Sequence, residues 1–305
     1  MYAGTFLNAL VFCIWMFRPK SRSLCCATYF SANAVADFLM LTIRPIILEK
    51  WIMRITWRIT DWTCKLTWSL YYSILQVSTW LSATITVERA WTIIFPFAFK
   101  SQDMDRRSKY IIALIVVMQP LTQIIHLMYV PISTDPVTND TNCHFNLGYK
   151  RRIVYSLQMC LAIAIPFLVI ATFNLATITV LCRNRCRQHT VSGNRDHVLV
   201  FTKITIMTGV SFVISYFPEV YRSIFIIFDL EMDSVILIAM YLSDGMVYLN
   251  SCMNPIICLV VCRSMHEDMK SFLMALIRIL RRPCACRQSR QDSQTANASQ
   301  IATPV

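Results

Sequence analysis

The residues of this sequence that are best able to do chemistry lie inside long apolar segments. Asp37 stands near the middle of one such segment, and Glu88 and Arg89 follow one another near the end of another. A carboxylate at the centre of a lipid bilayer costs about 2.5–3.5 kcal/mol even on the mildest insertion scale, so Asp37 needs polar partners there. Two arrangements meet this need: a protonated acid hydrogen-bonded to neighbouring helices, or a hard cation held by the carboxylate and neutral oxygens.

The familiar catalytic and zinc-binding motifs do not occur in the sequence. It contains no paired CxxC spacing, no HExxH, no GxSxG and no Walker A sequence. We therefore expect neither an enzyme nor an organic cofactor. The net charge of +12 could attract nucleic acid, but the basic residues are divided among short loops between apolar runs. That distribution is typical of membrane proteins, so nucleic acid is not an expected partner.

The composition places most of the chain in a lipid bilayer. The 305 residues are 56% hydrophobic and only 15% charged, with a mean hydropathy of +0.50, whereas soluble proteins carry about 25% charged residues. Apolar runs of spanning length predict seven helices. Their approximate cores are 1–17, 24–48, 65–95, 109–131, 153–182, 198–228 and 235–262.

Two further segments complete the predicted organisation. Residues 264–280 have one apolar and one basic face, so we expect a helix that lies along the membrane surface. Residues 287–305 are polar and predict a disordered tail. The first span gives only about 25 Å of helix, less than a bilayer requires. Either the chain lacks an amino-terminal part or its start is misjudged, and we favour the first explanation.

The segment from Cys64 to Pro96 is predicted to form the central helix. Arg89 follows Cys64 by 25 residues, which is about 37 Å of α-helix, one bilayer with an interface. Steps of three and four residues place eight residues on one face, and its cysteine, aromatic, hydroxyl and guanidinium groups give that face a polar seam; the residues are Cys64, Trp68, Tyr71, Leu75, Ser78, Ser82, Ile85 and Arg89. A polar seam that faces other helices indicates the centre of a bundle.

The spacing of these residues resembles that of rhodopsin-like (class A) G-protein-coupled receptors over nearly all of residues 4–286. The resemblance rests on the combined positions of Asp37, Cys64, Arg89, Pro96, Pro166, Pro218, Asn254 and Pro255. It implies an all-α membrane protein, a seven-helix bundle with a short amphipathic eighth helix. The receptor domain would cover 1–286 and the cytoplasmic tail 287–305, in the plasma membrane. With the amino terminus outside, 19 of the 29 Lys and Arg residues lie inside, which favours a cytoplasmic carboxy terminus.

The resemblance also implies a ligand pocket at the outer end of the bundle. Its residues would be Tyr71, Tyr72, Gln76, Glu219, Ser223, Asp244 and Tyr248. The carboxylates of Glu219 and Asp244 suit an arginine or amine on a peptide, although they could instead pair with Arg222 or Lys65. Aromatic residues and acids together look like the pockets of invertebrate neuropeptide receptors. An extracellular peptide is therefore the expected ligand, rather than retinal or a biogenic amine.

Signalling would run through residues that match the family's activation motifs, with a heterotrimeric G protein and arrestin as partners. These residues are Glu88, Arg89, Ala90, Phe212, Tyr216, Pro218, Asn254 and Pro255. Four positions depart from the family pattern: Ala90, Asn174, Tyr216 and Cys258. The departures favour, as an alternative, a receptor-like protein that binds ligand without activating a G protein. A transporter or channel is less consistent, because only Asp37 lies deep in the bilayer.

The remaining expectations come from the same resemblance and from short motifs. An allosteric sodium ion would be held by Asp37, Ser78, Asn250, Ser251 and Asn254. Cys64 and Cys143 would form a disulfide over the pocket mouth. Asn139 begins a glycosylation sequon, and Cys284 and Cys286 are candidates for palmitoylation. The final residues, 303–305, fit a ligand for a PDZ-domain protein.

Overall fold

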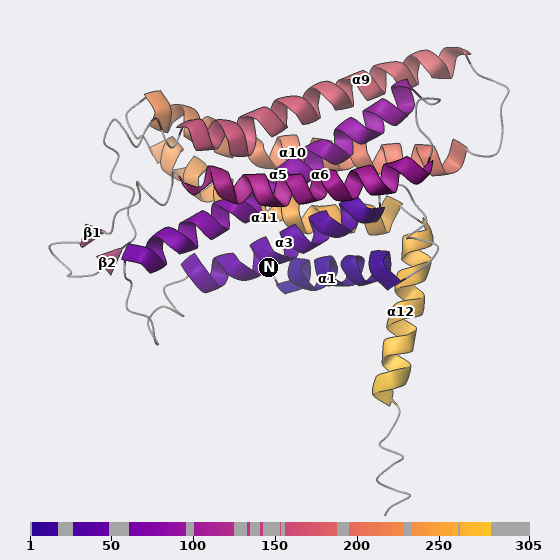
Figure 1. The fold of residues 1–305 in the computed structure, drawn as a ribbon, viewed down its shortest axis with the longest axis horizontal. Helices are drawn as coiled ribbons and strands as arrows, with labels where there is room; N and C mark the ends of the chain where they lie inside the picture. Colours follow the sequence, from indigo (N-terminus) through magenta and orange to yellow (C-terminus); the bar gives the residue numbers. More distant parts are fainter. Residues whose placement is uncertain are drawn as a thin grey trace, which may run out of the picture.

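Long helices, each with an apolar outer surface, make up almost all of the computed structural model (Figure 1). The structure describes residues 2–17, 27–48, 61–95, 101–124, 133–134, 141–142, 153, 156–187, 195–228, 234–261 and 263–281. Within these ranges the long helices are α1 (Tyr2–Phe17), α3 (Ala27–Leu48), α5 (Asp61–Ile94), α6 (Ser101–Thr122), α9 (Ile165–Arg187), α10 (Arg195–Phe228), α11 (Ser234–Val261) and α12 (Arg263–Arg281). Each of the seven predicted spans and the amphipathic segment therefore corresponds to a helix.

Two short strands also occur, β1 (Ser133–Thr134) and β2 (Thr141–Asn142), which pair antiparallel. They lie at the end of the bundle where α5 begins, and α12 leaves the opposite end (Figure 1). The fourth span differs most from its prediction, because α6 begins at Ser101 instead of residue 109. The charged residues of this first part were interpreted as a loop, but a helix can extend beyond the apolar core of a membrane.

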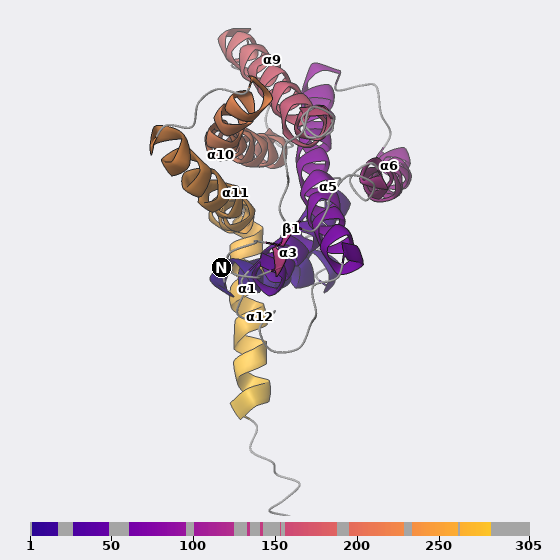
Figure 2. The same cartoon turned by 90° about the vertical axis from the view of Figure 1, so that its left-hand side faces the viewer.

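The central position predicted for the third span is confirmed. α5 packs against α3, α6, α9 and α10, and the view along the bundle shows it among these helices (Figure 2). α1 contacts α3 and α11, and α10 packs along α11, which closes the bundle on the other side. α12 packs against α1 and α11, and Met265 anchors it in the core.

Two described stretches are long and apolar enough to cross a membrane by composition alone, Ser156–Arg183 and Thr202–Phe225. A third, Gly245–Val261 together with Met265–Phe272, is bent by 101°. The other long helices carry polar groups on their inner faces, which lowers their average hydropathy. Their outer faces remain apolar: α6, for example, exposes Leu114, Val117 and Leu121.

The fifth span contains a wide turn that the sequence did not reveal. A π-helix, η1 (Cys160–Ala164), precedes α9 and Pro166, and the Ile165 amide donates to the Cys160 carbonyl. Such a turn rearranges the regular backbone bonding. Two α5 side chains bind carbonyls there: Thr79 Oγ1 donates to Ala162 at 2.9 Å, and Trp80 Nε1 donates to Leu161 at 3.0 Å.

Close contact between the first and last spans depends on Gly4. A Cβ atom added to this glycine would lie 2.3 Å from the Cys252 sulfur of α11. Asn8, one turn further along α1, donates from Nδ2 to the Ser251 carbonyl at 3.0 Å. Small residues at a helix interface permit such close backbone approach in membranes.

Candidate functional site

Asp37 of α3 is completely buried in a polar centre formed by three helices. Ser78 Oγ of α5 donates to its Oδ1 at 2.7 Å. Asn254 Nδ2 of α11 and Asn33 Nδ2 of α3 donate to its Oδ2 at 2.9 and 3.0 Å. Asn33 was not among the predicted partners, although its position four residues before Asp37 on one helix face could have indicated it. The polar partners that a mid-membrane carboxylate requires are therefore present.

The predicted cation would require buried oxygens that accept no hydrogen bond from the protein. The side-chain oxygens of Asn8 and Asn250 are buried and accept no hydrogen bond from any protein group. A carboxylate with nearby neutral oxygens is the ligand set that such cations prefer. Among the described residues no cluster of three His, Cys, Asp or Glu side chains occurs that could hold a transition metal.

Glu88 and Arg89 lie at the α12 end of α5, and Arg89 is buried. Glu88 Oε1 accepts a hydrogen bond from Tyr29 Oη of α3 at 3.5 Å and forms an ion pair with Arg107 Nη2 of α6, also at 3.5 Å. The Arg107 side chain is 49% exposed and that of Glu88 11%. Neither Tyr29 nor Arg107 was predicted to contact Glu88. The acid thus joins three helices, and Ala90 beside it is fully buried.

Aromatic side chains of α5 and α10 pack together next to Pro218. Phe212 and Tyr216 of α10 stack with their ring centroids 4.3 Å apart, and Tyr71 and Tyr72 meet edge to face at 5.3 Å. All four are buried in one cluster, against which Tyr248 of α11 packs. Pro218 interrupts the hydrogen-bonding of α10 directly after these rings. The predicted pivot therefore lies between packed aromatic rings and Glu219.

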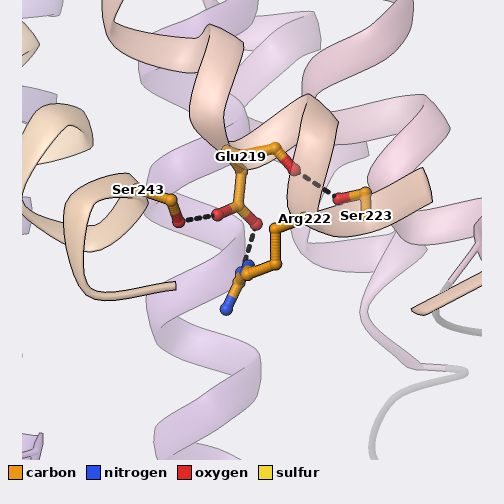
Figure 3. A network of polar contacts seen from close by, with 4 residues as sticks. All are labelled: Glu219, Arg222, Ser223 and Ser243. Carbon is orange, nitrogen blue, oxygen red and sulfur yellow. Dashed lines mark hydrogen bonds and ion pairs between the residues drawn. The ribbon is translucent and has the colours of Figure 1, made fainter. Parts of the chain in front are cut away.

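Glu219 lies in a network that joins α10 and α11 (Figure 3). Its Oε1 binds Nη2 of Arg222, and its Oε2 accepts a hydrogen bond from Ser243 Oγ of α11. Ser223 Oγ donates to the Glu219 backbone carbonyl at 2.8 Å. The structure therefore shows the alternative pairing of Glu219 with Arg222. Both oxygens of its carboxylate are already bound by side chains of the protein.

Gln76 takes part in a second polar network, which faces α6 and the fifth span. It is fully buried, and its Oε1 accepts from Thr122 Oγ1 at 2.7 Å and from Gln123 Nε2 at 2.9 Å. Gln158 Nε2 donates to Gln123 Oε1 at 3.2 Å. These contacts join α5 and α6 to the start of the fifth span. The side-chain amide nitrogen of Gln76 donates to no protein group.

All four departures from the family pattern are buried. Asn174 of α9 lies against Gly209 of α10, where an added Cβ atom would be 1.8 Å from Asn174 Nδ2. Cys258 of α11 belongs to the apolar cluster around α1 and α3.

Several predicted residues fall outside what the structure describes. These are Cys143, Asn139, Cys284, Cys286 and the tail 287–305. Cys64 and Asp244 belong to α5 and α11, but their side chains are not described. The disulfide, the modifications and the role of Asp244 remain predictions.

Comparison with known proteins agrees with this geometry. Residues 7–258 match the family described as "7 transmembrane receptor (rhodopsin family)". The chain is 25% identical to N-formyl peptide receptor 3 of Homo sapiens, over 96% of this chain and 86% of that one. It is 24% identical to the type-1 angiotensin II receptor of Canis lupus familiaris, over 83% and 72%. It is 27% identical to free fatty acid receptor 2 of Rattus norvegicus, over 48% and 44%. The chain belongs to the rhodopsin family of seven-transmembrane receptors.

Proposed function

We propose that this receptor binds an extracellular peptide and activates a heterotrimeric G protein through movement of α10. The observation that carries the proposal is the arrangement around Pro218. The stacked Phe212 and Tyr216 lie on one side of this proline, and Glu219, bound to α11, lies on the other. A ligand that contacts either group would shift α10 between two packed arrangements. Two of the relatives above are named for peptide ligands.

The inner part of the mechanism would involve Glu88 and Arg89. Glu88 already binds Tyr29 and Arg107, and in the resting state it would also hold the buried Arg89 inward. Movement of α10 would release Arg89 toward the G protein. Arrestin would compete for the same cytoplasmic face, and the carboxy-terminal residues 303–305 would bind a PDZ-domain protein. The carboxy terminus would accordingly be cytoplasmic.

A peptide library screened for nucleotide exchange on purified G proteins tests this function. A peptide that stimulates exchange on the wild type should give little stimulation on Arg89→Ala, with its binding retained. Leu168→Ala, a change at an exposed residue of α9, serves as a control with unaltered stimulation. Equal stimulation of wild type and Arg89→Ala would contradict the proposed route.

A receptor that binds its ligand without activating a G protein is the second candidate. The observation that favours it is the burial of Ala90, Asn174 and Cys258 in apolar or tightly packed surroundings. Peptide binding together with no nucleotide exchange on every G protein tested would support this candidate.

We also propose an allosteric sodium ion beside Asp37. Asp37, Ser78, Asn250, Ser251 and Asn254 would hold it, and the buried Asn250 side-chain oxygen, which accepts no hydrogen bond from the protein, supports the proposal. Sodium should raise the melting temperature of the wild type relative to an equal concentration of choline. Asp37→Asn should show no difference between the two salts, and an equal sodium effect in both proteins would contradict the site.

A further inference from the structure

The carboxylate of Glu219 is buried and its charge is already balanced inside the protein. Arg222 supplies the positive charge from the next turn of α10, and Ser243 supplies a hydroxyl donor from α11 (Figure 3). Glu219 is 4% exposed. A second cation brought beside this neutral pair would gain little Coulomb energy while losing its own hydration. Simple addition of a ligand cation is therefore unfavourable.

The two partners of Glu219 differ in how easily they can leave it. The Arg222 side chain is 20% exposed, whereas Ser243 is completely buried. Arg222 lies on the same helix as Glu219, so loss of this ion pair breaks no contact between helices. Loss of Ser243 would break a contact between α10 and α11. Arg222 is therefore the partner that can be exchanged.

We propose that Arg222 is a resident cation in the position of a ligand guanidinium group, and that a ligand binds Glu219 by displacing it. This inference rests on the proposed receptor function and specifies its ligand chemistry. Arg222 thereby becomes a specificity-determining residue. A planar guanidinium can replace the one that leaves, because it offers the same fork of donors. An ammonium is more strongly hydrated and lacks that fork, so arginine-bearing ligands are favoured over lysine-bearing ones.

Methylguanidinium tests the exchange without knowledge of the natural ligand. Arg222→Ala leaves the Glu219 position open, and about 100 mM methylguanidinium should then raise the melting temperature by about 2–4 °C over the same concentration of methylammonium. Wild-type protein should show no such difference, because Arg222 fills the position. The double variant Glu219→Gln, Arg222→Ala is the matched control and should also show none.

Each other outcome overturns the inference. An equal methylguanidinium effect in the wild type or in the double variant would show that the ion acts elsewhere. No effect in Arg222→Ala would show that the position does not accept a guanidinium. Should Arg222→Ala fail to fold, Arg222→Met takes its place, since methionine keeps an unbranched apolar stem and has no donor for Glu219.

A peptide experiment separates this inference from the proposed function. For an arginine-containing agonist found in the library screen, Arg222→Ala should lower the half-maximal concentration about tenfold, whereas the citrulline analogue should gain nothing. If no peptide activates a G protein while the methylguanidinium result holds, the proposed function fails and the exchange site stands. If peptides activate the wild type but Arg222→Ala changes neither the methylguanidinium effect nor the half-maximal peptide concentration, only the exchange site fails.

Discussion

Single side chains in this receptor are explained by the need to satisfy buried polar groups in a membrane. Asp37 was predicted to require partners because of its depth, and Ser78 and Asn254 indeed donate to it. Arg107 could not have been predicted as a partner of Glu88, because it lies on another helix whose start was misplaced. The position of a polar residue deep within a predicted span thus indicates that it needs partners. The identity of those partners depends on how the helices are rotated about their axes.

Replacing Asp37 by leucine removes the acceptor of three hydrogen bonds and leaves buried donors on Ser78, Asn33 and Asn254. We expect the free energy of unfolding to fall by about 2 kcal/mol or more. Asp37→Asn retains one acceptor oxygen and should be affected less. Melting temperatures in detergent, measured in sodium-free buffer, compare the two, and an equal loss would contradict the role of the acceptor.

The contacts between elements are where prediction from the sequence was least complete. The helices themselves follow from apolar length, so their approximate bounds were predictable. The π-helix was not, because its carbonyls bind side chains of Thr79 and Trp80 that come from a different helix. Likewise, nothing local indicates that Gln76 faces Gln123 rather than the tyrosines of the expected pocket. Both contacts depend on how the helices are rotated about their axes, which the local sequence does not specify.

Thr79→Val keeps the shape of the side chain but removes the hydrogen bond from α5 to η1. We expect a loss of about 1 kcal/mol in the free energy of unfolding. Thr172→Val is the matched control, because the Thr172 hydroxyl is exposed and bonds only within its own helix in the described contacts. Thermal unfolding with equal losses in both variants would show that the interhelical bond contributes nothing.

Gly209→Ala tests the close packing of α10 on α9. The new methyl group would collide with Asn174, 1.8 Å away, and press on Ile170 at 3.2 Å, so we expect destabilisation of about 1–3 kcal/mol. Gly245→Ala in α11 is the control: an added Cβ atom meets nothing within 4 Å there, and alanine should stabilise the helix by up to about 1 kcal/mol. Adding Asn174→Ala to Gly209→Ala should restore most of the lost stability.

For the molecule as a whole, the ends of the bundle define two sides of the membrane. β1 and β2 lie at one end and α12 at the other (Figure 1). The sequence predicted this arrangement because the basic residues are unevenly divided between alternate loops. Average hydropathy alone identifies only two clear spans among the described residues. The other spans were predicted from the length of their apolar runs, although the polar side chains on their inner faces lower the average hydropathy.

The predicted topology places residue 139 outside the cell and the carboxy terminus inside it. Glycosidase treatment should therefore shift the electrophoretic mobility of the wild type but not that of Asn139→Gln. An antibody against a carboxy-terminal tag should bind only after the cells are permeabilised. Binding to intact cells would contradict the orientation.

The contact of Gly4 and Asn8 with α11 has a consequence for biosynthesis. Ribosomes produce α1 first, yet the Ser251 carbonyl that receives the Asn8 amide belongs to the final span. During translation one hydrogen of the Asn8 amide can bond the Gly4 carbonyl in the same helix, but the other must find a temporary acceptor, such as water or the insertion machinery, until α11 emerges. Packing of α1 against α11 is thus one of the last steps in maturation of the receptor. Substitution of Gly4 should impair that late step.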